Sequence, residues 1–516
     1  MITIRETTFS DIDAALNIYS LAKQFMRTSG NHAQWTGDYP AQADIINDIN
    51  RHCSFVGVDQ ANKIHFIFAF ITAPDHTYNY IDGNWLNDRP YGTIHRIASD
   101  GSIPRVVEIA CDFCNKICPN IRIDTHADNQ PMQRALERLD FSLCGTIYLA
   151  DGAPRLAFQK SWPRLWLFNP ENDIALAQGS ANFTPPAAAV KLARSGATLP
   201  FWMADECDRV MCHGVDDRWL TDIQSEFDIK SEPWNGSTDI LPNPWGWSLP
   251  VRNNLVEAGF APEQLPSDMS ICKLRALSHR RTSVFVADLL RKSLQFEIWP
   301  TAIEVFSTDE ISALVAESSC VVKAPWSSSG RGIAFADKNT IQNQLPRFAG
   351  TIRRQGSLLV EKHAHRLLDF AMLFDYAFGQ CQFVGFSVFD TLANGSYSGN
   401  IVAPQSQLLD RITQFIPLEQ IELVQKALPN ALTKVLSYNY FGPVGVDMLV
   451  AQTAHGPILH AVVEINLRYT MGRVALSLYQ KIGRVGHFTI NPANVSTNPN
   501  AIRLTPPGTD FTFALI

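Results

Sequence analysis

The sequence lacks the long apolar runs and the excess of positive charge that mark two large classes of protein. No stretch approaches the roughly 20 apolar residues that span a bilayer, so we expect no membrane partner. The chain has 43 lysines and arginines against 50 acidic residues, and its net charge of −7 argues against a nucleic-acid partner. The N-terminal residues also lack the charged and then apolar layout of a signal peptide. These absences predict a cytoplasmic protein.

A disulfide framework is absent as well, because the ten cysteines are spread along the whole chain. Cys111, Cys114 and Cys118 have a spacing that suits a metal or an iron–sulfur cluster, but no fourth ligand follows at a familiar spacing. The same spacing places the three thiols on one face of a helix, where cysteine behaves as a small hydrophobic residue. We therefore expect a buried thiol face, with a metal site as the alternative.

What remains is the composition of an ordinary globular protein. Its 516 residues, of which 46% are hydrophobic and 18% charged, exceed what one hydrophobic core normally serves. We predict a multidomain chain of mixed α+β and α/β type. The expected domains are residues 1–160, residues 165–265 and residues 266–516.

Residues 321–333 have the pattern of a phosphate-binding loop. An apolar strand is expected to end at Lys323, and a loop of small residues around Arg331 follows at once. Such a loop can bring backbone N–H groups and hydroxyls close to a polyphosphate, and the lysine adds positive charge for phosphate oxygens. A surface turn after a strand is the alternative. The candidate phosphate-binding residues are Lys323, Ser327, Ser328, Ser329, Gly330 and Gly332.

The first 160 residues read as an α+β domain with a mainly antiparallel sheet. A strand at residues 2–5 leads into a helix that the segment 8–11 caps. The apolar spacing then predicts further elements in this order: a hairpin of 54–58 and 64–72, a strand at 91–98, a helix at 105–118, a strand at 121–124, a helix at 129–139 and a hairpin of 145–149 and 155–160.

Within this order of elements, the segments IRIDTHADNQPMQRALERLDF and CGTIYLADGAPRLAFQK resemble the GNAT family of N-acyltransferases over residues 1–160. The resemblance implies a domain that binds acetyl-CoA. In the family, a loop at a helix N-terminus holds the pyrophosphate. Residues 98–105 correspond to that loop, and of its pattern Gly101 and Arg105 remain. Asn129 is the best match to the family's contact with the pantetheine arm.

The chain departs from this family at positions that bear on catalysis. The tyrosine that often serves as the general acid is replaced by Leu136, and the glycine before the closing phenylalanine is Asp140. Trp35 is a candidate for an acceptor pocket, with a core aromatic as the alternative. Tyr148 offers a hydroxyl or is an ordinary strand tyrosine. A domain that only binds or docks an acyl-CoA is therefore an alternative to acetyl transfer.

A small α/β subdomain is expected between residues 165 and 265. Its first strand, at residues 165–168, is followed by a polar cluster at the strand end, where open α/β sheets bind ligands. Helix capping would explain the cluster almost as well. The cluster consists of Asn169, Glu171, Asn172 and Asp173.

Two apolar strands near residues 445–450 and 461–466 carry acidic side chains. Glu464 and Asn466 lie on one face by alternation, and Asp447 can join them across the hairpin. Two carboxylates and an amide oxygen suit Mg²⁺, whereas buried carboxylates without a cation would be costly. Exposed acids on an edge strand are the alternative. Arg468 follows on the same alternation, where it can balance charge on a phosphoryl group.

In this order, these residues resemble the ATP-grasp superfamily over residues 165–516. The resemblance implies that Lys323 binds phosphate, that Glu361, Lys362 and His363 contact adenine, and that Asp369 holds the ribose. Arg280 or Arg281 stands where the family has its first nucleotide-binding lysine. It further implies that Asp447, Glu464 and Asn466 hold Mg²⁺ or Mn²⁺ and that Lys323 and Arg468 are catalytic.

The function that follows is an ATP-dependent ligase. ATP would phosphorylate a small-molecule carboxylate, an amine would displace phosphate from the acylphosphate, and ADP would be released. Residues 394–407 are expected to form a lid, and Arg473 either pairs with a second carboxylate or is a surface charge. The alternatives are an ATP-grasp kinase without ligation, and a regulatory protein that binds nucleotide and acyl-CoA without turnover.

Overall fold

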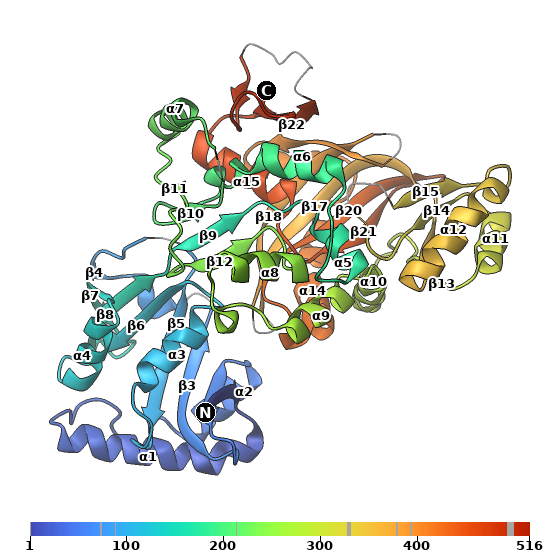
Figure 1. Cartoon of the computed structure of the whole chain (residues 1–516). Coiled ribbons are helices and arrows are strands. Elements are labelled where there is room, and N and C mark those ends of the chain that lie inside the picture. The colour runs from blue at the N-terminus through green and yellow to red at the C-terminus, as the bar shows by residue number, and fades with distance from the viewer. Residues whose placement is uncertain are drawn as a thin grey trace. The chain divides into compact units, whose positions relative to one another are not determined.

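The computed structural model describes residues 2–72, 75–87, 89–212, 214–327, 332–377, 380–392, 395–492 and 500–516. Ser328, Ser329 and Gly330 of the expected phosphate loop, together with Arg331, lie outside the described residues. The chain divides into two compact units, Met1–Pro163 and Arg164–Ile516 (Figure 1). The further division expected near residue 265 stays a prediction. Within the described residues, no helix is both long enough and apolar enough to cross a membrane.

The N-terminal unit is built on one eight-stranded sheet in the order β1-β2-β3-β5-β6-β8-β7-β4, and β5 and β6 are its parallel pair. Its strands are β1 (Thr3–Glu6), β2 (Ser54–Val58), β3 (Ile64–Ile71), β4 (Asp82–Gly83), β5 (Gly92–Ser99), β6 (Asn120–Thr125), β7 (Ser142–Tyr148) and β8 (Pro154–Ser161). Its α-helices are α1 (Ile12–Thr28), α2 (Gln42–Asn50), α3 (Val106–Cys114) and α4 (Gln130–Arg138). Both expected hairpins are present.

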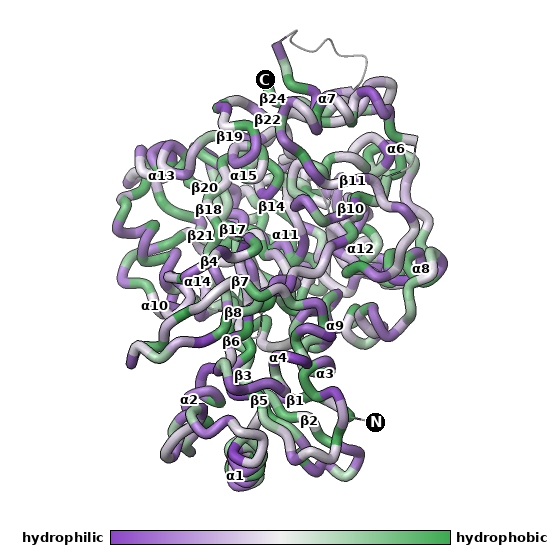
Figure 2. Tube along the Cα trace, turned by 90° about the vertical axis from the view of Figure 1, so that its left-hand side faces the viewer, coloured by the Kyte–Doolittle hydropathy of each residue, from purple (hydrophilic) through white to green (hydrophobic). Residues whose placement is uncertain are grey.

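The core of this unit forms where the central strands meet the helices. Every residue of β2 and β3 is buried, and both strands carry mostly hydrophobic residues (Figure 2). Cys111 and Cys114 on α3 are buried, which confirms the thiol face for these two residues. The helix expected over 105–118 is shorter than predicted, because α3 ends at Cys114 and the chain then turns. Helix α2 was not anticipated.

The C-terminal unit contains three sheets: β11-β10-β9-β12, β13-β16-β14-β15 and the eight-stranded β21-β20-β17-β18-β19-β22-β24-β23. The strands of the first two are β9 (Arg164–Leu167), β10 (Arg209–Val210), β11 (Glu232–Pro233), β12 (Leu241–Pro244), β13 (Ile303–Val305), β14 (Cys320–Lys323), β15 (Ile333–Ala336) and β16 (Leu358–Lys362). Those of the third are β17 (His365–Ala377), β18 (Gln380–Thr391), β19 (Tyr397–Val402), β20 (Gly442–Thr453), β21 (Gly456–Asn466), β22 (Gly486–Pro492), β23 (Ile502–Arg503) and β24 (Phe511–Leu515).

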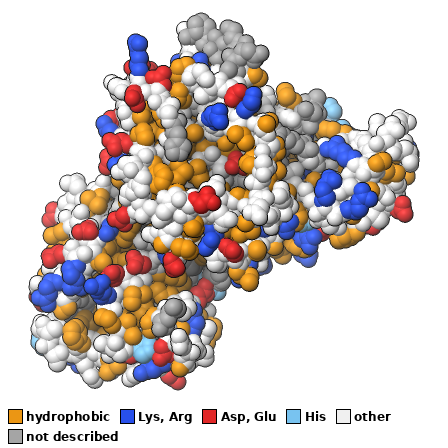
Figure 3. Space-filling model, viewed as in Figure 1, with side chains coloured by type: hydrophobic (Ala, Val, Ile, Leu, Met, Phe, Trp, Pro, Cys, Tyr) orange, Lys and Arg blue, Asp and Glu red, His pale blue; other side chains and the backbone are white. Residues whose placement is uncertain are grey.

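Eleven α-helices accompany these sheets in the described residues: α5 (Asn172–Gln178), α6 (Ala187–Gly196), α7 (Asp217–Phe227), α8 (Leu249–Glu257), α9 (Asp268–Leu277), α10 (Arg281–Ser293), α11 (Thr308–Glu317), α12 (Ile341–Gln355), α13 (Gln405–Thr413), α14 (Leu418–Leu436) and α15 (Met471–Ile482). Helix α12 ends in Arg353 and Arg354, and basic side chains gather on this part of the surface (Figure 3). Cations in the last turn interact favourably with the helix dipole. The mixed α+β and α/β class predicted from the sequence is confirmed.

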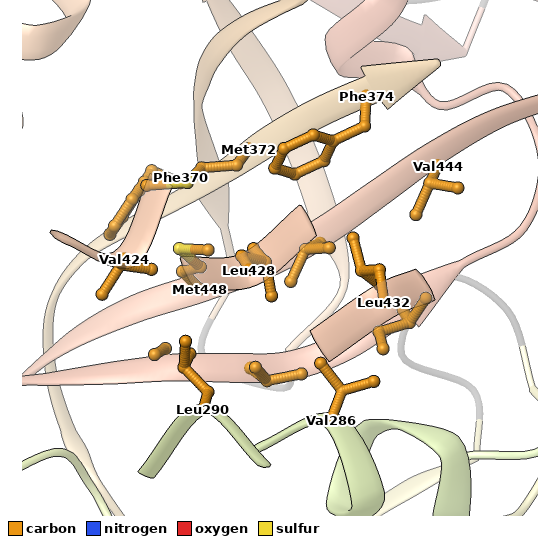
Figure 4. Packing of buried hydrophobic residues seen from close by; sticks show 14 of the residues in the cluster. Val286, Leu290, Phe370, Met372, Phe374, Val424, Leu428, Leu432, Val444 and Met448 are labelled. Atoms are coloured by element: carbon orange, nitrogen blue, oxygen red, sulfur yellow. The ribbon is translucent and has the colours of Figure 1, made fainter. Parts of the chain in front are cut away.

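The eight-stranded sheet has one apolar and one polar face around its centre. Phe370 and Met448 are paired in register, and their face packs on α10 and α14, where Val286 and Leu428 contribute to the same cluster (Figure 4). Side chains alternate along a strand, so Asp369 and Asp447 lie on the opposite face. The apolar face fixes the register of the strands, and the register in turn fixes where the acidic side chains lie.

The lid expected over residues 394–407 is not found in its described part. Residues 397–402 form β19, which pairs with β18 and β22, and α13 begins at Gln405. Residue 394 lies outside the described residues. The polar composition suggested a loop, but Asn400 is buried and donates hydrogen bonds to Ser387 and to the carbonyl of Val388. Side-chain hydrogen bonds thus allow a polar strand to be buried inside the sheet.

Candidate active site

Lys323 occupies the last position of β14 and is almost fully buried. Its Nζ lies 2.6 Å from Oε1 of Glu361 on β16, and Oε2 of Glu361 lies 3.4 Å from Nε2 of His460 on β21. Burial acts to raise the pKa of Glu361, but the Lys323 ammonium and the His460 ring hold it at about 2. A charged network therefore links three strands from two different sheets.

Arg280 immediately precedes α10, and its guanidinium links the residues after β14 to Glu464 on β21. Its Nη1 donates to the carbonyl of Ala324 at 2.5 Å and to Oγ of Ser327 at 2.7 Å. Its Nη2 donates to Oε1 of Glu464 at 2.8 Å. Arg281 instead pairs with Glu304 at 2.8 Å. Arg280 is thus the arginine that reaches both Ser327 and Glu464, and which of the two binds nucleotide stays a prediction.

Gly332 closes the phosphate loop against the strand that precedes it. Its carbonyl accepts a hydrogen bond from the Ala324 backbone at 2.8 Å. A Cβ at this position would lie 2.3 Å from Cβ of Ser327, which leaves no room for any other residue. The missing side chain of Gly332 therefore allows its backbone to approach Ser327 closely.

Asp447 on β20 and Glu464 on β21 are directly opposite in the ladder, and Nδ2 of Asn466 donates to Oδ2 of Asp447 at 3.0 Å. Burial and the neighbouring Glu464 carboxylate raise the pKa of Asp447 to about 7, against the effects of Arg468 and of the Asn466 hydrogen bond. The structure therefore brings the three expected metal ligands together on one face. Within the described residues, no three His, Cys, Asp or Glu side chains are grouped as a metal site, so this site rests on two carboxylates and an amide.

Arg468 lies beside Asn466 and pairs with Asp173 on α5. Its Nε and Nη2 both donate to the carboxylate of Asp173 on α5, at 2.7 to 2.9 Å, and Nη2 also donates to Oδ1 of Asn466 at 2.9 Å. A two-pronged guanidinium–carboxylate contact fixes the orientation of the arginine as well as its position.

The other polar residues after β9 have structural contacts. Asn169 exchanges hydrogen bonds with the Gly246 backbone, and the Asn172 amide is placed to donate to the carbonyls of Gly246 and Trp247. Burial raises the pKa of Glu171, whose Oε2 has no partner in the described residues. Of this cluster, Asp173 is the member that pairs with Arg468, two residues after the end of β21.

The residues expected at the adenosine end lie on β16, β17 and the turn between them. Glu361 is buried in the Lys323 network, Lys362 is exposed, and the backbone N–H of His363 donates to Ser319. Oδ2 of Asp369 accepts a hydrogen bond from Thr391 at 2.6 Å, and burial raises its pKa in spite of nearby Arg366. Asp369 and Asp447 share one face of the sheet.

Two hollows flank the Arg280–Glu464 pair. One is lined by Asp173, Trp326, Ser327, Glu464 and Asn466, among others. The other is lined by Arg280, Ser283, Lys323, Leu359, Glu361 and Val462, among others. Of the expected phosphate-binding residues, Ser327 thus lines the hollow that also contains Asp173, and Lys323 lines the hollow that also contains Glu361.

His460 was missed in the sequence, although the alternation that selected Glu464 also places His460 on the same face of β21. The surface alternative for Arg473 is wrong, because this arginine is mostly buried and pairs with Asp375. Nη1 of Arg473 has no partner in the described part of the chain.

In the N-terminal unit, the loop that corresponds to the pyrophosphate loop is occupied by its own side chains. Oδ1 of Asp100 accepts hydrogen bonds from the backbone N–H and the hydroxyl of Ser102, at 2.9 and 2.5 Å, and Oδ2 lies 3.0 Å from His65. Arg105 is largely exposed and lies 3.6 Å from Glu108. Gly101 has φ of +79° and open space around it. The loop therefore presents a carboxylate where a pyrophosphate is expected.

Asn129 caps α4, since its Oδ1 accepts a hydrogen bond from the Met132 backbone and its Nδ2 donates to Gln34. Trp35 packs edge-on against Tyr19 with ring centroids 5.6 Å apart, at the border of the core. Tyr148 is exposed on β7. The contacts of Trp35 agree with a core aromatic, while the binding roles of Asn129 and Tyr148 stay predictions.

No family model matches the sequence, and neither does any curated protein. Among solved structures, an acetyltransferase of the GNAT family from Streptococcus agalactiae is 31% identical, with 31% of this chain and 95% of that chain covered and a TM-score of 0.29. An N5-carboxyaminoimidazole synthetase from Staphylococcus aureus, complexed with ADP, is 11% identical, with 69% and 93% covered and a TM-score of 0.36. The biotin carboxylase domain of a Hydrogenobacter thermophilus 2-oxoglutarate carboxylase, in complex with MgADP and bicarbonate, is 14% identical, with 69% and 85% covered and a TM-score of 0.37.

Both resemblances noted in the sequence, to GNAT and to ATP-grasp enzymes, are thus found again among solved structures. The identity of 31% extends over nearly the whole of the streptococcal chain. The N-terminal unit is thus similar to acetyltransferases of the GNAT family over nearly the whole length of the streptococcal chain.

Proposed function

We propose that the C-terminal unit is an ATP- and Mg²⁺-dependent ligase that joins a carboxylate to an amine through an acylphosphate and releases ADP. The observation that carries this proposal is that two buried cations, Lys323 and Arg280, line one hollow, and that Arg280 also contacts Glu464 of the Asp447–Glu464 pair. A polyphosphate with a divalent cation supplies the charges that complement both groups.

Lys323, Arg280 and Ser327 form the phosphate end of the site. Both cations are held by buried acids, Glu361 and Glu464. Such pairs keep the cations oriented before ATP arrives, and phosphate oxygens can then share them. Lys323 also stabilises negative charge on the transferring phosphoryl group. Ser328, Ser329, Gly330 and Gly332 are proposed to complete this end as the sequence predicts.

Asp447, Glu464 and Asn466 fit a divalent cation by their donor set. The carboxylates of Asp447 and Glu464 face each other, and the negative charge of Glu464 helps burial to raise the pKa of Asp447. Asn466 turns its amide nitrogen toward Asp447 and its oxygen toward Arg468, so its oxygen becomes a ligand when the amide rotates. A bound Mg²⁺ or Mn²⁺ neutralises charge on the phosphate oxygens.

The adenosine end is assigned to β16 and β17. Glu361, Lys362 and His363 contact adenine, and Asp369, which accepts from Thr391, holds the ribose. At the opposite end, Arg468 stabilises the acylphosphate, and Asp173 orients it. The substrates of this reaction are a small-molecule carboxylate and an amine.

The test is ADP formation by the full chain with ATP, Mg²⁺ and pairs drawn from a panel of carboxylic acids and amines. Glu464→Gln is expected to lower the rate by about 10²-fold or more, since the metal loses a charged ligand. The matched control is Glu422→Gln, because Glu422 is exposed on α14. Full activity of the Glu464 variant would remove the site assignment.

The same assay separates the two alternatives. A phosphorylated carboxylate that accumulates in spite of added amine indicates a kinase. A rise in Tm with ATP and Mg²⁺ without ADP from any pair indicates a binding protein without turnover, because ligands that bind the folded state stabilise it.

For the N-terminal unit, we propose acyl transfer from acetyl-CoA to an amine. Its similarity to a GNAT acetyltransferase supports this second function. Gly101, Arg105 and Asn129 remain the proposed contacts to the acetyl-CoA. The test is the transfer of an acetyl group to an amine in the absence of ATP, measured by mass spectrometry of the product.

A further inference from the structure

Strands β5 and β6 of the N-terminal unit part soon after they meet. They are parallel but pair only through Gly92 with Ile121 and Thr93 with Arg122, although β5 runs on to Ser99. Their facing backbone groups beyond this point are therefore released from the ladder. Strand β5 also bulges after His95, where its register against β3 shifts and Arg96 takes φ of 52°. Bulges of this kind re-aim side chains next to functional sites.

His95 and Asp124 are close neighbours at the point where the strands part. Nε2 of His95 lies 3.1 Å from Oδ2 of Asp75, and Nδ1 lies 3.8 Å from Oδ1 of Asp124. Tyr78 donates its hydroxyl hydrogen to the same Asp124 oxygen at 2.7 Å. All three members of this His–Asp cluster keep some exposure, with 20% for His95, 23% for Asp75 and 14% for Asp124.

The hydrogen bonds of this cluster assign the protons. The bond from His95 is the largest cause that lowers the pKa of Asp75, so Asp75 is an ionised acceptor and Nε2 carries the ring hydrogen. The lone pair of Nδ1 then faces a carboxylate that is too far for a hydrogen bond. An ammonium group placed between Nδ1 and Asp124 can donate to both.

The departure from the GNAT pattern at Leu136 makes this cluster relevant to the reaction. Leu136 is fully buried and has no proton to give, so proton transfer has to occur elsewhere. The leaving group needs little help, since a thiol with a pKa of about 8.5 departs readily as a thiolate. The amine, in contrast, must lose a proton before it can attack.

We propose that His95, oriented by Asp75, is the general base of an acyl-transfer site in the N-terminal unit, and that the acceptor is a primary ammonium held between His95 and Asp124. The inference rests on the acyl transfer proposed above and adds its base and its substrate class. Nδ1 takes one proton from the ammonium, and the amine nitrogen then forms a bond to the thioester carbonyl carbon. The C–S bond breaks, the thiolate leaves with the electron pair, and the second proton passes from the nitrogen to the thiolate or to water.

Asp75 is a positioning residue in this scheme, because its carboxylate accepts a hydrogen bond from Nε2 of His95. Asp75→Asn is expected to lower kcat with little change in the KM for acetyl-CoA, because the base is less well oriented while the donor site is untouched. Asp75→Glu, which can still accept from His95, should recover part of kcat, which a merely structural role would not produce.

The experiment uses the full chain with acetyl-CoA and a panel of primary amines: spermidine, cadaverine, lysine and a peptide with a free N-terminus. Products are measured by mass spectrometry. His95→Ala is expected to lower transfer by about 10²-fold or more. The matched control is His52→Ala, which should leave the rate unchanged, because His52 also lies near a carboxylate, Glu6 at 3.6 Å, but is largely exposed.

The outcomes separate this inference from the function on which it rests. Transfer by His95→Ala at the wild-type rate overturns the base assignment and leaves acyl transfer standing. If neither the wild type nor any variant acetylates an amine of the panel, acyl transfer and this inference are both overturned. If His95→Ala unfolds, His95→Gln replaces it, and ¹⁵N NMR of the wild-type ring gives an independent test. Hydrogen on Nε2 supports the proposal, and hydrogen on Nδ1 overturns it.

Discussion

Each unit presents a loop at a strand end where phosphate groups are expected, but the charges around the two loops are opposite. In the C-terminal unit, Lys323 and Arg280 are buried, pair with Glu361 and Glu464, and lie at the end of β14 and beside Ser327. In the N-terminal unit, the carboxylate of Asp100 accepts the hydrogen bond from the Ser102 backbone N–H that would otherwise be available to a phosphate oxygen. A nucleotide should therefore bind through electrostatics in one unit and against them in the other.

The comparison also shows how each arrangement is kept in place. The C-terminal cations are buried between sheets, so their orientation depends on paired acids. The N-terminal loop is stabilised within a few residues by Asp100 and Ser102. Substitution of any member of the buried C-terminal network should disturb the orientation of the others, whereas substitution within the N-terminal turn should have only a local effect. The predictions below test this difference.

The largest effect is expected for Lys323→Ala in the C-terminal unit. Loss of the buried ammonium should lower ADP formation by about 10²- to 10³-fold, because a preorganised positive charge at the phosphoryl group disappears. ADP formation with ATP and Mg²⁺ is the measurement. Lys338→Ala, at an exposed lysine, is the control and should be unaffected. Equal activity of the two variants would show that the buried ammonium of Lys323 does not contribute to ADP formation.

The same substitution removes the ion pair between Glu361 and Lys323 and leaves the His460 ring beside the carboxylate, and a broken buried pair costs about 3 to 5 kcal/mol. Loss of activity could then reflect loss of folding. A Lys323→Gln variant combined with Glu361→Gln removes both charges and restores a neutral pair. It should recover Tm but not activity, which separates the two effects.

The second prediction concerns the acid side of stability. The pKa of Glu361 is lowered from 4.5 to about 2 in the folded protein, so its ion pairs stabilise the fold above pH 4.5. That contribution is lost as the pH falls toward 2, and it amounts to about 3 kcal/mol at one pKa unit per 1.36 kcal/mol. The free energy of unfolding of the wild type should therefore approach that of Glu361→Gln in this range.

The measurement is guanidinium unfolding of the C-terminal transition at several pH values between 6 and 2.5. Glu422→Gln serves again as the exposed control and should follow the wild type. A constant difference between wild type and Glu361→Gln across this range would show that the Lys323 pair does not lower the pKa of Glu361.

A third and smaller effect is expected for Asp173→Asn. The fork between Asp173 and Arg468 loses its charge but keeps one hydrogen bond, so Arg468 is less well oriented. We expect kcat to fall about tenfold with little change in the KM for ATP, because the contact acts on the acylphosphate end of the site. The control is Asp217→Asn, an exposed acid in the first turn of α7. A change in KM for ATP alone would place Arg468 at the nucleotide instead.

The sequence predicted the parts of this site that depend on alternation. Asp447 and Glu464 face each other because strands separated by a short turn pair in register, and side chains alternate along each strand. The sequence did not choose between Arg280 and Arg281. That choice depends on where α10 begins, and helix ends are the least certain feature of a sequence pattern.

Two other features could not be predicted from the sequence, for a different reason. His95 and Asp75 are 20 positions apart, and the bulge in β5 that brings them together depends on pairing with β3. β19 was read as a loop because its polar residue Asn400 is satisfied by Ser387, a side chain on another strand. Contacts between distant segments decide both cases, and local patterns do not record them.

The smallest effect is expected where a local turn blocks the phosphate position. Asp100→Asn keeps the turn, because an amide oxygen can still accept from Ser102, but it removes the negative charge. The affinity of the full chain for acetyl-CoA should rise about fivefold, since repulsion between like charges near a surface is worth about 1 kcal/mol. Titration calorimetry measures this change. Asp151→Asn is the matched control, because Asp151 accepts from the backbone of its own turn at Ala153 and lies between β7 and β8. Unchanged affinity in both variants would mean that the pyrophosphate does not approach the loop, and the donor would then be held through its pantetheine arm alone.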